Sequence, residues 1–317
     1  MSDYINEALS LYGLENAKVT LLRHNENRTY RVDCDGQSYC LRIKSPVSGF
    51  DLSVFDGDKE KLLRSELEFI TALGEQTDIL IQQPVKTLSG DFVAKLPDKT
   101  LASLLCWMDG IPFDNVNRTQ QMLICAGETL AKLRNVQEAN HQLNNYHRYS
   151  YDQKLIQKLV LKAEQGQEYL PIETIRSIIK ALDTVTKIMD ELDESGKLFI
   201  SQADPSLSNM IWSEGKVGLI DWSLSGYAHS YMDLGGLMGA TSDREEQRLL
   251  LKGWENIRGK TDRRYIDAYF SLTVLLFVCC QYTRAKEWVE WFPSALERWQ
   301  TTIFEPLVSG EPLTCIL

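Results

Sequence analysis

The sequence predicts an α+β protein with two lobes, a small N-terminal lobe built on an antiparallel sheet with one helix and a larger, mainly helical C-terminal lobe. Short strand-like segments dominate roughly the first hundred residues, whereas periodic helical patterns dominate from about residue 112 onward. A chain of 317 residues is also long enough for two lobes that each bury a core. We therefore expect one lobe over residues 1–105 and the other over 106–317.

The N-terminal lobe is expected to begin with a short helix over residues 3–12. Three strands follow, with polar turns between them, at 18–23, 28–33 and 38–44. Residues 57–74 place a broad apolar face among charged residues, which predicts an amphipathic helix. Two more short strands are expected near 82–86 and 91–95. The pattern therefore indicates a sheet of about five strands with a helix inserted after the third.

The C-terminal lobe is expected to follow an apolar strand, Leu101–Gly110, which ends in Asp-Gly and marks the junction between the lobes. Helical periodicity then covers residues 117–136, 151–163, 172–192, 243–257, 262–281 and 293–303. A pair of strands interrupts these helices at 198–221. Polar residues at the ends of those strands are the first candidates for a functional site.

Composition excludes several classes of protein. The net charge of −10 argues against a general nucleic-acid binder, which would carry a basic patch. The N-terminus lacks the basic and apolar segments of a signal peptide, and the longest apolar run, Leu272–Cys280, is about half a membrane span. The seven cysteines are odd in number and scattered, which is typical of reduced thiols. We expect a cytoplasmic protein without a membrane partner; the oligomeric state is left open.

Asp204, Asn209 and Asp221 are the candidate chemical groups at the ends of the two strands. Two carboxylates and an amide in such loops are either surface polar residues or oxygen ligands for a hard divalent cation. Mg²⁺ usually takes one or two carboxylates together with substrate phosphates. In that case Asn209 and Asp221 supply the metal ligands, and Asp204 is free to face a substrate hydroxyl.

The spacing of these residues resembles the signature of the aminoglycoside phosphotransferase and choline kinase-like family, which has a protein-kinase-like fold. The family pattern is His-Gly-Asp, an Asn five residues later, a strand ending in Asp, and a further Asp about a dozen residues on. The corresponding residues here are Gln202-Ala203-Asp204, Asn209, Asp221 and Asp233. The resemblance covers most of the chain and implies that Asp233 braces the catalytic loop.

Upstream segments extend the resemblance to the nucleotide site. Arg42 occupies the position of the basic residue that grips the α- and β-phosphates, with Lys44 on the same strand face as the alternative. Glu66 resembles the acid that pairs with this base, although Glu68 is a near neighbour. Trp107 lies in a segment, 106–110, that resembles the adenine-binding hinge.

The turn at residues 24–27 resembles the family's phosphate-covering hairpin. It contains Asn25 and Asn27 but no glycine, which matches the phosphotransferase branch better than the glycine-rich loop of protein kinases. The resemblance therefore assigns Asn25, Asn27, Arg42, Glu66 and Trp107 to nucleotide binding.

The resemblance implies transfer of the γ-phosphate of ATP or GTP, with Mg²⁺, to a hydroxyl of a small molecule. Asp204 would orient the hydroxyl and accept its proton, while Asn209 and Asp221 would hold Mg²⁺ on the phosphates. Only 11 residues separate Asp221 from Asp233, and no Ala-Pro-Glu follows. This is too short for a protein-kinase activation segment, so a protein substrate is not expected.

Other readings remain open at this point. Gln202 replaces the family histidine, although its amide can still donate a hydrogen bond, so a nucleotide-binding pseudokinase is the first alternative. A non-enzymatic interaction protein with an acidic surface is the second.

Within the kinase reading, the acceptor could be an aminoglycoside, choline, an amino alcohol such as homoserine, or a sugar. Aromatic and acidic residues on the last helices are expected to be core and surface residues; lining the cleft, they would suit a cationic amine. They are Trp288, Trp291, Trp299, Glu287 and Glu290.

Overall fold

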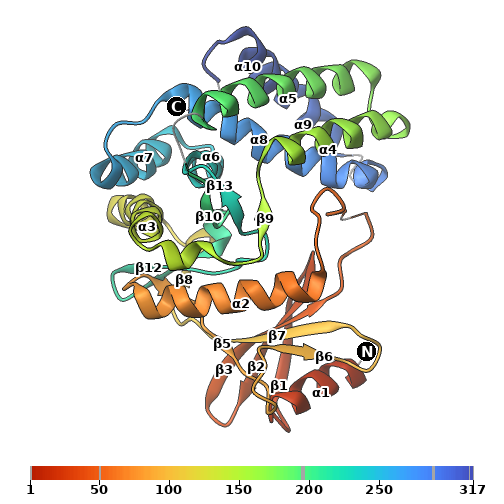
Figure 1. Cartoon of the computed structure of the whole chain (residues 1–317), viewed down its shortest axis with the longest axis vertical. Coiled ribbons are helices and arrows are strands. Elements are labelled where there is room, and N and C mark those ends of the chain that lie inside the picture. Colours follow the sequence, from red (N-terminus) through yellow and green to blue (C-terminus); the bar gives the residue numbers. More distant parts are fainter. Residues whose placement is uncertain (1, 50, 194–196, 288–289, 314, 317) are drawn as a thin grey trace.

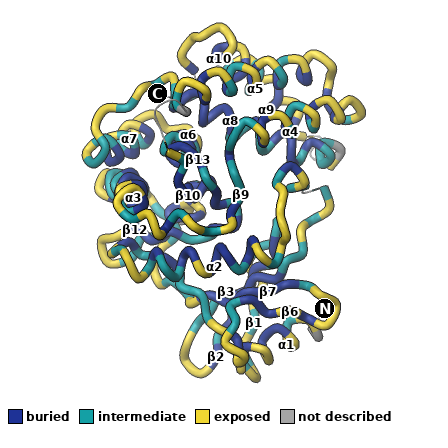
Figure 2. The backbone as a smooth tube through the Cα atoms, viewed as in Figure 1, coloured by how far each residue is buried: buried dark blue, intermediate teal, exposed yellow. Residues whose placement is uncertain are grey.

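The computed structural model describes residues 2–49, 51–193, 197–287, 290–313 and 315–316. It shows a small lobe built on an antiparallel sheet and a larger helical lobe, at the bottom and top of Figure 1. The predicted α+β, two-lobed fold is confirmed. Buried residues line the contact between the lobes as well as each interior (Figure 2).

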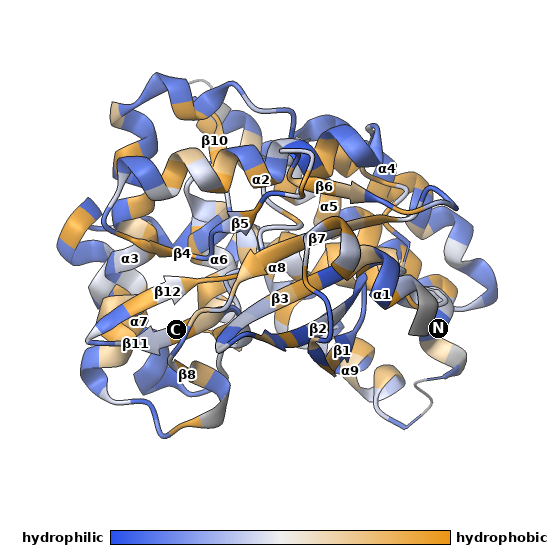
Figure 3. Ribbon diagram, turned by 90° about the horizontal axis from the view of Figure 1, so that it is seen from below, coloured by the Kyte–Doolittle hydropathy of each residue, from blue (hydrophilic) through white to orange (hydrophobic). Residues whose placement is uncertain are grey.

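The sheet of the small lobe has the order β1-β2-β3-β7-β5, with β6 also paired to β7. Its strands are β1 (Lys18–His24), β2 (Asn27–Cys34), β3 (Gln37–Lys44), β5 (Pro84–Val85), β6 (Val93–Lys95) and β7 (Leu101–Cys106). All of these pairs are antiparallel. The central strand β7 is apolar along most of its length (Figure 3). The three strands predicted first lie within two residues of their observed bounds.

One helix covers each face of this sheet. Helix α1 (Ser2–Leu11) packs on the face that carries Leu41 and Ile43, whereas α2 (Lys59–Gln76) packs on the face that carries Cys40 and Arg42. Asp58 begins α2, because its carboxylate accepts hydrogen bonds from two backbone N–H groups of the first turn. Strand alternation thus directs Arg42 toward α2 and the second lobe.

The sequence analysis missed the short strands at 80–81, 111–112, 149–150 and 226–228, and the first of them joins the two parts of the chain. β4 (Leu80–Ile81) pairs in parallel with β12 (Lys216–Leu219), in a four-stranded sheet of order β4-β12-β11-β8. The other members are β11 (Met210–Ser213) and β8 (Ile111–Pro112). A two-residue strand carries no alternating pattern, so its pairing is set by distant contacts. We retain the boundary between the lobes at residues 105/106 as a proposal. β4 precedes this boundary in the chain but pairs with a strand of the C-terminal part.

The helical lobe surrounds a three-stranded sheet of order β10-β13-β9. Its strands are β9 (Tyr149–Ser150), β10 (Phe199–Ser201) and β13 (Gly226–Ala228). Its helices are α3 (Gln120–Ala139), α4 (Gln153–Glu164), α5 (Ile172–Asp193), α6 (Tyr231–Gly239), α7 (Arg244–Arg258), α8 (Arg263–Gln281), α9 (Phe292–Trp299) and α10 (Glu305–Ser309). Short 3-10 segments, η1 to η5, occupy Phe113–Asn115, His141–Asn144, Gln165–Glu168, Leu207–Asn209 and Tyr282–Lys286, and a π-helical turn, η6, occupies Gln300–Phe304.

Helix α8 is the central helix of this lobe. In the described part of the chain, the segment Arg263–Ala285 is the one helix long and apolar enough to cross a membrane, but 67% of its most apolar stretch is buried inside the protein. The predicted buried helix at 272–280 lies within it. Buried side chains of α8 pack in the main core, which the two lobes share.

The connection between β3 and α2 reaches across to the helical lobe. We call residues 45–58, apart from residue 50, the strap; it rises toward α4 at the right of Figure 1. The Asp51 N–H donates to the carbonyl of Cys280 at 3.0 Å, and Asp51 and Asp56 form ion pairs with Lys162 and Lys158 of α4. The strap therefore closes one side of the space between the lobes.

Helices α3 and α7 cross at two glycines, and this contact gives a testable prediction. A Cβ at Gly127 would lie 2.0 Å from the carbonyl oxygen of Leu250, and one at Gly253 would lie 2.0 Å from that of Ile124. In both cases the new Cβ would clash with a backbone atom, which cannot shift without displacing the helix. We expect Gly127→Ala to lower the free energy of unfolding by about 2 kcal/mol.

Chemical denaturation measures this loss, with Gly166→Ala as the control. At Gly166 the nearest atom to a new Cβ is the flexible Leu170 side chain, at 3.3 Å. Equal stability of the two variants would contradict the close crossing of α3 and α7.

Candidate active site

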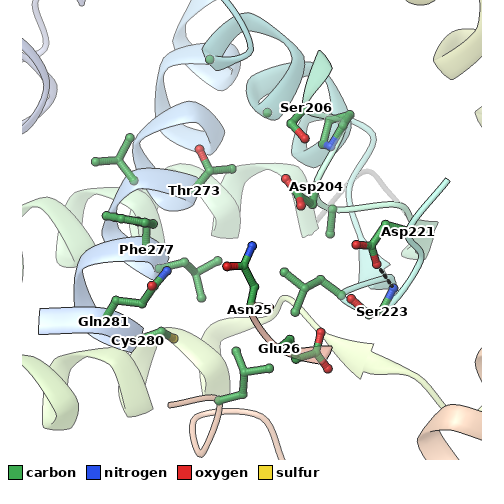
Figure 4. A pocket seen from close by; sticks show the side chains of 18 of the residues that line it. Asn25, Glu26, Asp204, Ser206, Asp221, Ser223, Thr273, Phe277, Cys280 and Gln281 are labelled. Atoms are coloured by element: carbon green, nitrogen blue, oxygen red, sulfur yellow. Dashed lines mark hydrogen bonds between the residues drawn. The ribbon is translucent and has the colours of Figure 1, made fainter. Parts of the chain in front are cut away.

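A cleft of about 400 Å³ lies where the strap and the β1–β2 turn face the helical lobe. Its lining includes the turn residues Asn25 and Glu26, the loop after β10 and the loop after β12. Figure 4 shows Asp204 and Asp221 on one side of the cleft, residues of α8 on the other, and Asn25 between them. Side chains from segments that are far apart in the sequence thus meet in one space.

Asp204 and Asn209 belong to the loop between β10 and β11 and contact each other directly. The Asn209 Nδ2 group donates to the Asp204 carboxylate at 2.9 Å and to the Asp204 backbone carbonyl at 3.0 Å. The other amide atom, Asn209 Oδ1, is buried and has no hydrogen-bond partner. Because buried polar atoms are normally paired, this oxygen is a candidate ligand for a cation.

Two side chains brace this loop from behind. The Gln202 Nε2 group donates to the carbonyl of Ile220 at 2.7 Å, which ties the loop to the end of β12. The Ala203 N–H donates to a carboxylate oxygen of the buried Asp233 at 2.9 Å. Asp233 therefore contacts the backbone of the Asp204 loop, as the resemblance implied, and the Gln202 amide donates a hydrogen bond, as expected.

Asp221 lies two residues beyond β12, in an unusual backbone conformation. It and Ala203 are two of the six non-glycine residues with positive φ in the described chain, at 58° and 64°. Such conformations are uncommon and gather at functional sites, where surrounding contacts hold them. The backbone hydrogen bond from Ile220 to Asn209, 3.0 Å, joins this turn to the Asp204 loop.

The Asp221 carboxylate faces two guanidinium groups. Arg42 Nη1 lies 3.7 Å from one of its oxygens, and Arg23, at the end of β1, forms an ion pair with the other. Burial works to raise the pKa of Asp221, but Arg23 and Arg42 outweigh it and hold the pKa below its usual range. Asp221 is therefore ionised near neutral pH.

Asp204 has a different environment from Asp221. Burial raises the pKa of Asp204 to about 7, with a further contribution from the negative charge of Asp221 and opposition from the Asn209 hydrogen bond. A carboxyl group whose pKa lies close to ambient pH is well suited to accept a proton in a reaction. Asp221 is thus ionised, as expected for a metal ligand, whereas Asp204 has a raised pKa, as expected for a proton acceptor.

Arg42 and Glu66 form a buried ion pair behind Asp221. Their nearest atoms are 2.7 Å apart, and the side chains are 8% and 2% exposed. Burial works to lower the pKa of Arg42, but the carboxylates of Glu66 and Asp221 more than offset it and raise the pKa. Glu68, the other candidate on α2, is exposed. The pair links α2, β3 and the Asp221 loop.

Arg148, from the helical lobe, places a second guanidinium group beside Glu66. Its guanidinium donates to the carbonyls of Leu62, Trp222, Ser223 and Ser225, at 2.6 to 3.1 Å. It also lies 3.9 Å from the Glu66 carboxylate and is 1% exposed. Arg148 thus joins α2 to the loop that presents Asp221.

The remaining predicted nucleotide residues divide into two groups. Asn25 and Asn27 line the cleft, and Asn27 Oδ1 is buried without a hydrogen-bond partner. Lys44, the alternative to Arg42, forms an ion pair with Glu26 of the same turn. Trp107 lies outside the lining of the cleft; it follows β7, and the Arg31 guanidinium lies 4.7 Å from its ring centre. Its role at the hinge stays a prediction.

Sequence reasoning missed Arg23 and Arg148. Both side chains act through contacts more than 70 residues away in the chain, with Asp221 and with the loop that follows it. Arg23 gave one weak signal, since it directly precedes the predicted phosphate-covering turn. Arg148 gave none, because its burial depends on how the lobes pack.

The contact between Arg23 and Asp221 gives a second prediction. The guanidinium, with a side chain 38% exposed, competes with any cation that binds the Asp221 carboxylate. We expect Arg23→Gln to tighten Mn²⁺ binding in the absence of nucleotide about fivefold, because a partly exposed ion pair is removed. Calorimetric titration measures it, with Arg28→Gln on the neighbouring strand as the control. Unchanged affinity in both variants would show that Arg23 does not compete for the site.

Comparison with known proteins identifies the family. The profile of the phosphotransferase enzyme family matches residues 18–269, which is most of the chain. The chain belongs to this family. The predicted resemblance is thus confirmed, and the protein is a phosphotransferase. The match includes β1 to β13, and with them Asp204, Asn209 and Asp221. No curated protein matches the chain in sequence.

Solved structures of other phosphotransferases have the same fold. An aminopropanol kinase associated with a microcompartment is 19% identical, with a TM-score of 0.76 over 99% of this chain and 100% of that chain. An amicoumacin kinase, solved in complex with AMP-PNP, Ca²⁺ and Ami, is 16% identical, with a TM-score of 0.69 over 99% of this chain and 94% of that chain. A spectinomycin phosphotransferase with ADP and spectinomycin is 15% identical (TM-score 0.63; 97% and 96%).

Proposed function

We propose that this phosphotransferase transfers the γ-phosphate of ATP, with Mg²⁺, to a hydroxyl of a small molecule in the cytoplasm. The observation that carries the proposal is the arrangement of Asp204, Asn209 and Asp221: a proton acceptor hydrogen-bonded to an amide whose other atom is buried and unpaired, beside an ionised carboxylate. The seven cysteines are free in the structure, which is consistent with a reducing compartment.

The donor atoms fit a hard divalent cation. Asn209 Oδ1 is a buried oxygen without a partner, and Asp221 is a carboxylate on the adjoining turn. The described residues contain no group of three or more His, Cys, Asp and Glu side chains that could hold a metal alone. A site of one amide and one carboxylate oxygen suits Mg²⁺, which fills its shell with waters and phosphate oxygens. Bound there, Mg²⁺ would neutralise charge on the transferring phosphoryl group.

The protein's own residues position the reactants. Arg42, fixed by Glu66, and Arg23 place positive charge where the nucleotide phosphates would lie. Asn25 and Asn27 present amides from the β1–β2 turn. The acceptor oxygen forms a bond to the γ-phosphorus, its proton passes to Asp204, and the bond to the β-phosphate oxygen breaks, which releases ADP. The strap limits the access of water from one side.

Nucleotide consumption tests the proposal directly. We expect turnover of ATP with a panel of hydroxylated metabolites and antibiotics in the presence of Mg²⁺, and its loss with excess EDTA. GTP in place of ATP tests the nucleotide preference. The structural relatives act on aminopropanol, amicoumacin and spectinomycin by their names, so the panel includes amino alcohols and antibiotics. Nucleotide binding without turnover of any acceptor would indicate the pseudokinase alternative.

A further inference from the structure

The acceptor end of the cleft has walls of unusual composition. Helix α8 forms one wall, and Thr273, Phe277, Cys280 and Gln281 face the space opposite Asp204 (Figure 4). Residues of the strap, and Tyr151, which directly follows β9, contribute further apolar and aromatic side chains. The apolar and aromatic side chains of the lining include Leu52, Phe55, Tyr151, Phe270, Phe277 and Trp299.

Aromatic rings on both sides give these walls a fixed shape. On the α8 side, the centre of the Phe277 ring lies 5.9 Å from that of Trp299. On the strap side, the Phe55 ring lies 4.5 Å from Tyr149 and 5.5 Å from Tyr151. Trp299 thus lines the cleft, Trp291 is 42% exposed, and Trp288 lies outside the described residues. An apolar body fits between rings held in this way.

Charged groups in the described lining are few and already engaged. They are Arg23, Glu26, Asp204 and Asp221. Glu26 is paired with Lys44, and Asp221 with Arg23 and Arg42. Asp204 serves as the proposed proton acceptor. Glu287 and Glu290 are exposed and are not among the residues that line the cleft. The described α8 wall therefore offers no further carboxylate to a cationic acceptor.

The polar atoms of the α8 wall are neutral. The Thr273 hydroxyl donates to the carbonyl of Phe270 at 2.7 Å, and Arg284 donates to the Gln281 side-chain oxygen at 3.3 Å. Burial raises the pKa of the Cys280 thiol to about 12, so the sulfur is not ionised. These groups suit a hydroxyl or an amide on the acceptor rather than several ammonium groups.

We propose that the acceptor is a compact hydroxyl compound with an apolar or aromatic body and no more than one positive charge. This inference rests on the proposed function and narrows its substrate class. An ammonium group placed against the apolar wall without a carboxylate loses its hydration without compensation. One such group can still lie over an aromatic face. The cleft of about 400 Å³ must also hold the transferred phosphoryl group, which favours a small acceptor.

A set of matched alcohols tests the class of acceptor. The probes are 3-phenylpropan-1-ol, 2-amino-3-phenylpropan-1-ol, 2-aminopropane-1,3-diol and kanamycin, each with ATP and Mg²⁺. We expect kcat/KM for the better phenyl-bearing alcohol to exceed that for the aminopropanediol at least tenfold, with no turnover of kanamycin. Preference for kanamycin, or equal turnover of the aminopropanediol and the phenyl compounds, would overturn the proposal.

Substitutions of Phe277 test whether the α8 wall determines the preference for a phenyl-bearing alcohol. We expect Phe277→Leu and Phe277→Ala to lower kcat/KM for the preferred phenyl-bearing alcohol, by about tenfold in the alanine variant, while the KM for ATP stays the same. Leu161→Ala, on the exposed side of α4, is the control for truncation of an apolar side chain. Should Phe277→Ala fail to fold, Phe277→Leu still reports the effect. An unchanged preference in a folded variant contradicts the role of this wall.

Nucleotide binding separates this inference from the proposed function. ADP with MgCl₂ should raise the melting temperature of the wild-type protein. If ADP binds and no probe is phosphorylated, the assigned acceptor class is wrong while the nucleotide site stands. If ADP does not bind, the proposed function fails together with the inference.

Discussion

Replacement of Asp204 by Asn is expected to lower the rate of phosphoryl transfer by about 10³-fold, because an amide cannot accept the proton of the attacking hydroxyl. The substitution keeps the shape of the side chain and removes negative charge beside Asp221. The variant should therefore unfold at the same or a higher temperature than the wild type. ATP consumption with the best acceptor measures the rate, and thermal unfolding measures the stability.

Nucleotide affinity distinguishes a catalytic role from a structural one. Arg42, Asn209 and Asp221 are unchanged in Asp204→Asn, so ADP should bind with the same affinity. Asp183→Asn, at an exposed position on α5 where the side chain is 63% exposed, is the matched control and should keep full activity. A variant at position 204 that stays fully active would show that another group accepts the proton.

The part of the site that could be predicted from the sequence is the part set by local pattern. Alternation along β3 places Cys40 and Arg42 on one face, and the periodicity of α2 turns Glu66 inward and Glu68 outward. Both rules act over a few residues. The loop between Asp204 and Asn209 is equally local, and its internal hydrogen bonds follow from a spacing of five residues.

The part that could not be predicted depends on contacts between distant segments. Arg148 is buried because α2 and the loop at 222–225 both present carbonyls to it, and no pattern around residue 148 signals this. The pairing of β4 with β12 and the position of Trp299 in the cleft have the same origin. Tertiary packing determines these positions, whereas the spacing of Asp204 and Asn209 determines the hydrogen bonds within their loop.

Gln202 illustrates how a departure from the family pattern can preserve a local structure. Its amide donates to the carbonyl of Ile220 and thereby holds the Asp204 loop against the Asp221 turn. The other side-chain atom, Oε1, is buried without a hydrogen-bond partner. The brace is therefore present with Gln at this position, which supports an active enzyme over the pseudokinase alternative.

Glu66→Gln is expected to lower the free energy of unfolding by about 3 kcal/mol, because it leaves the buried Arg42 without its nearest counter-charge. Arg42 keeps Asp221 as a partner at 3.7 Å, so the chain should still fold. The same change should raise the KM for ATP, since Arg42 is no longer held in place. Urea denaturation and steady-state kinetics measure the two effects. Glu68→Gln, two residues away and exposed, makes the same chemical change outside the pair and should alter neither.

A double-mutant cycle shows whether the two effects share one cause. If Arg42 and Glu66 act as a pair, the loss in Arg42→Gln/Glu66→Gln should be smaller than the sum of the single losses, because the second change removes a group already left unpaired. Additive losses would mean that Glu66 stabilises α2 through Arg148, which lies 3.9 Å from its other oxygen. In that case the position of Arg42 would depend on Asp221, and bound Mg²⁺ would weaken the contact that holds it.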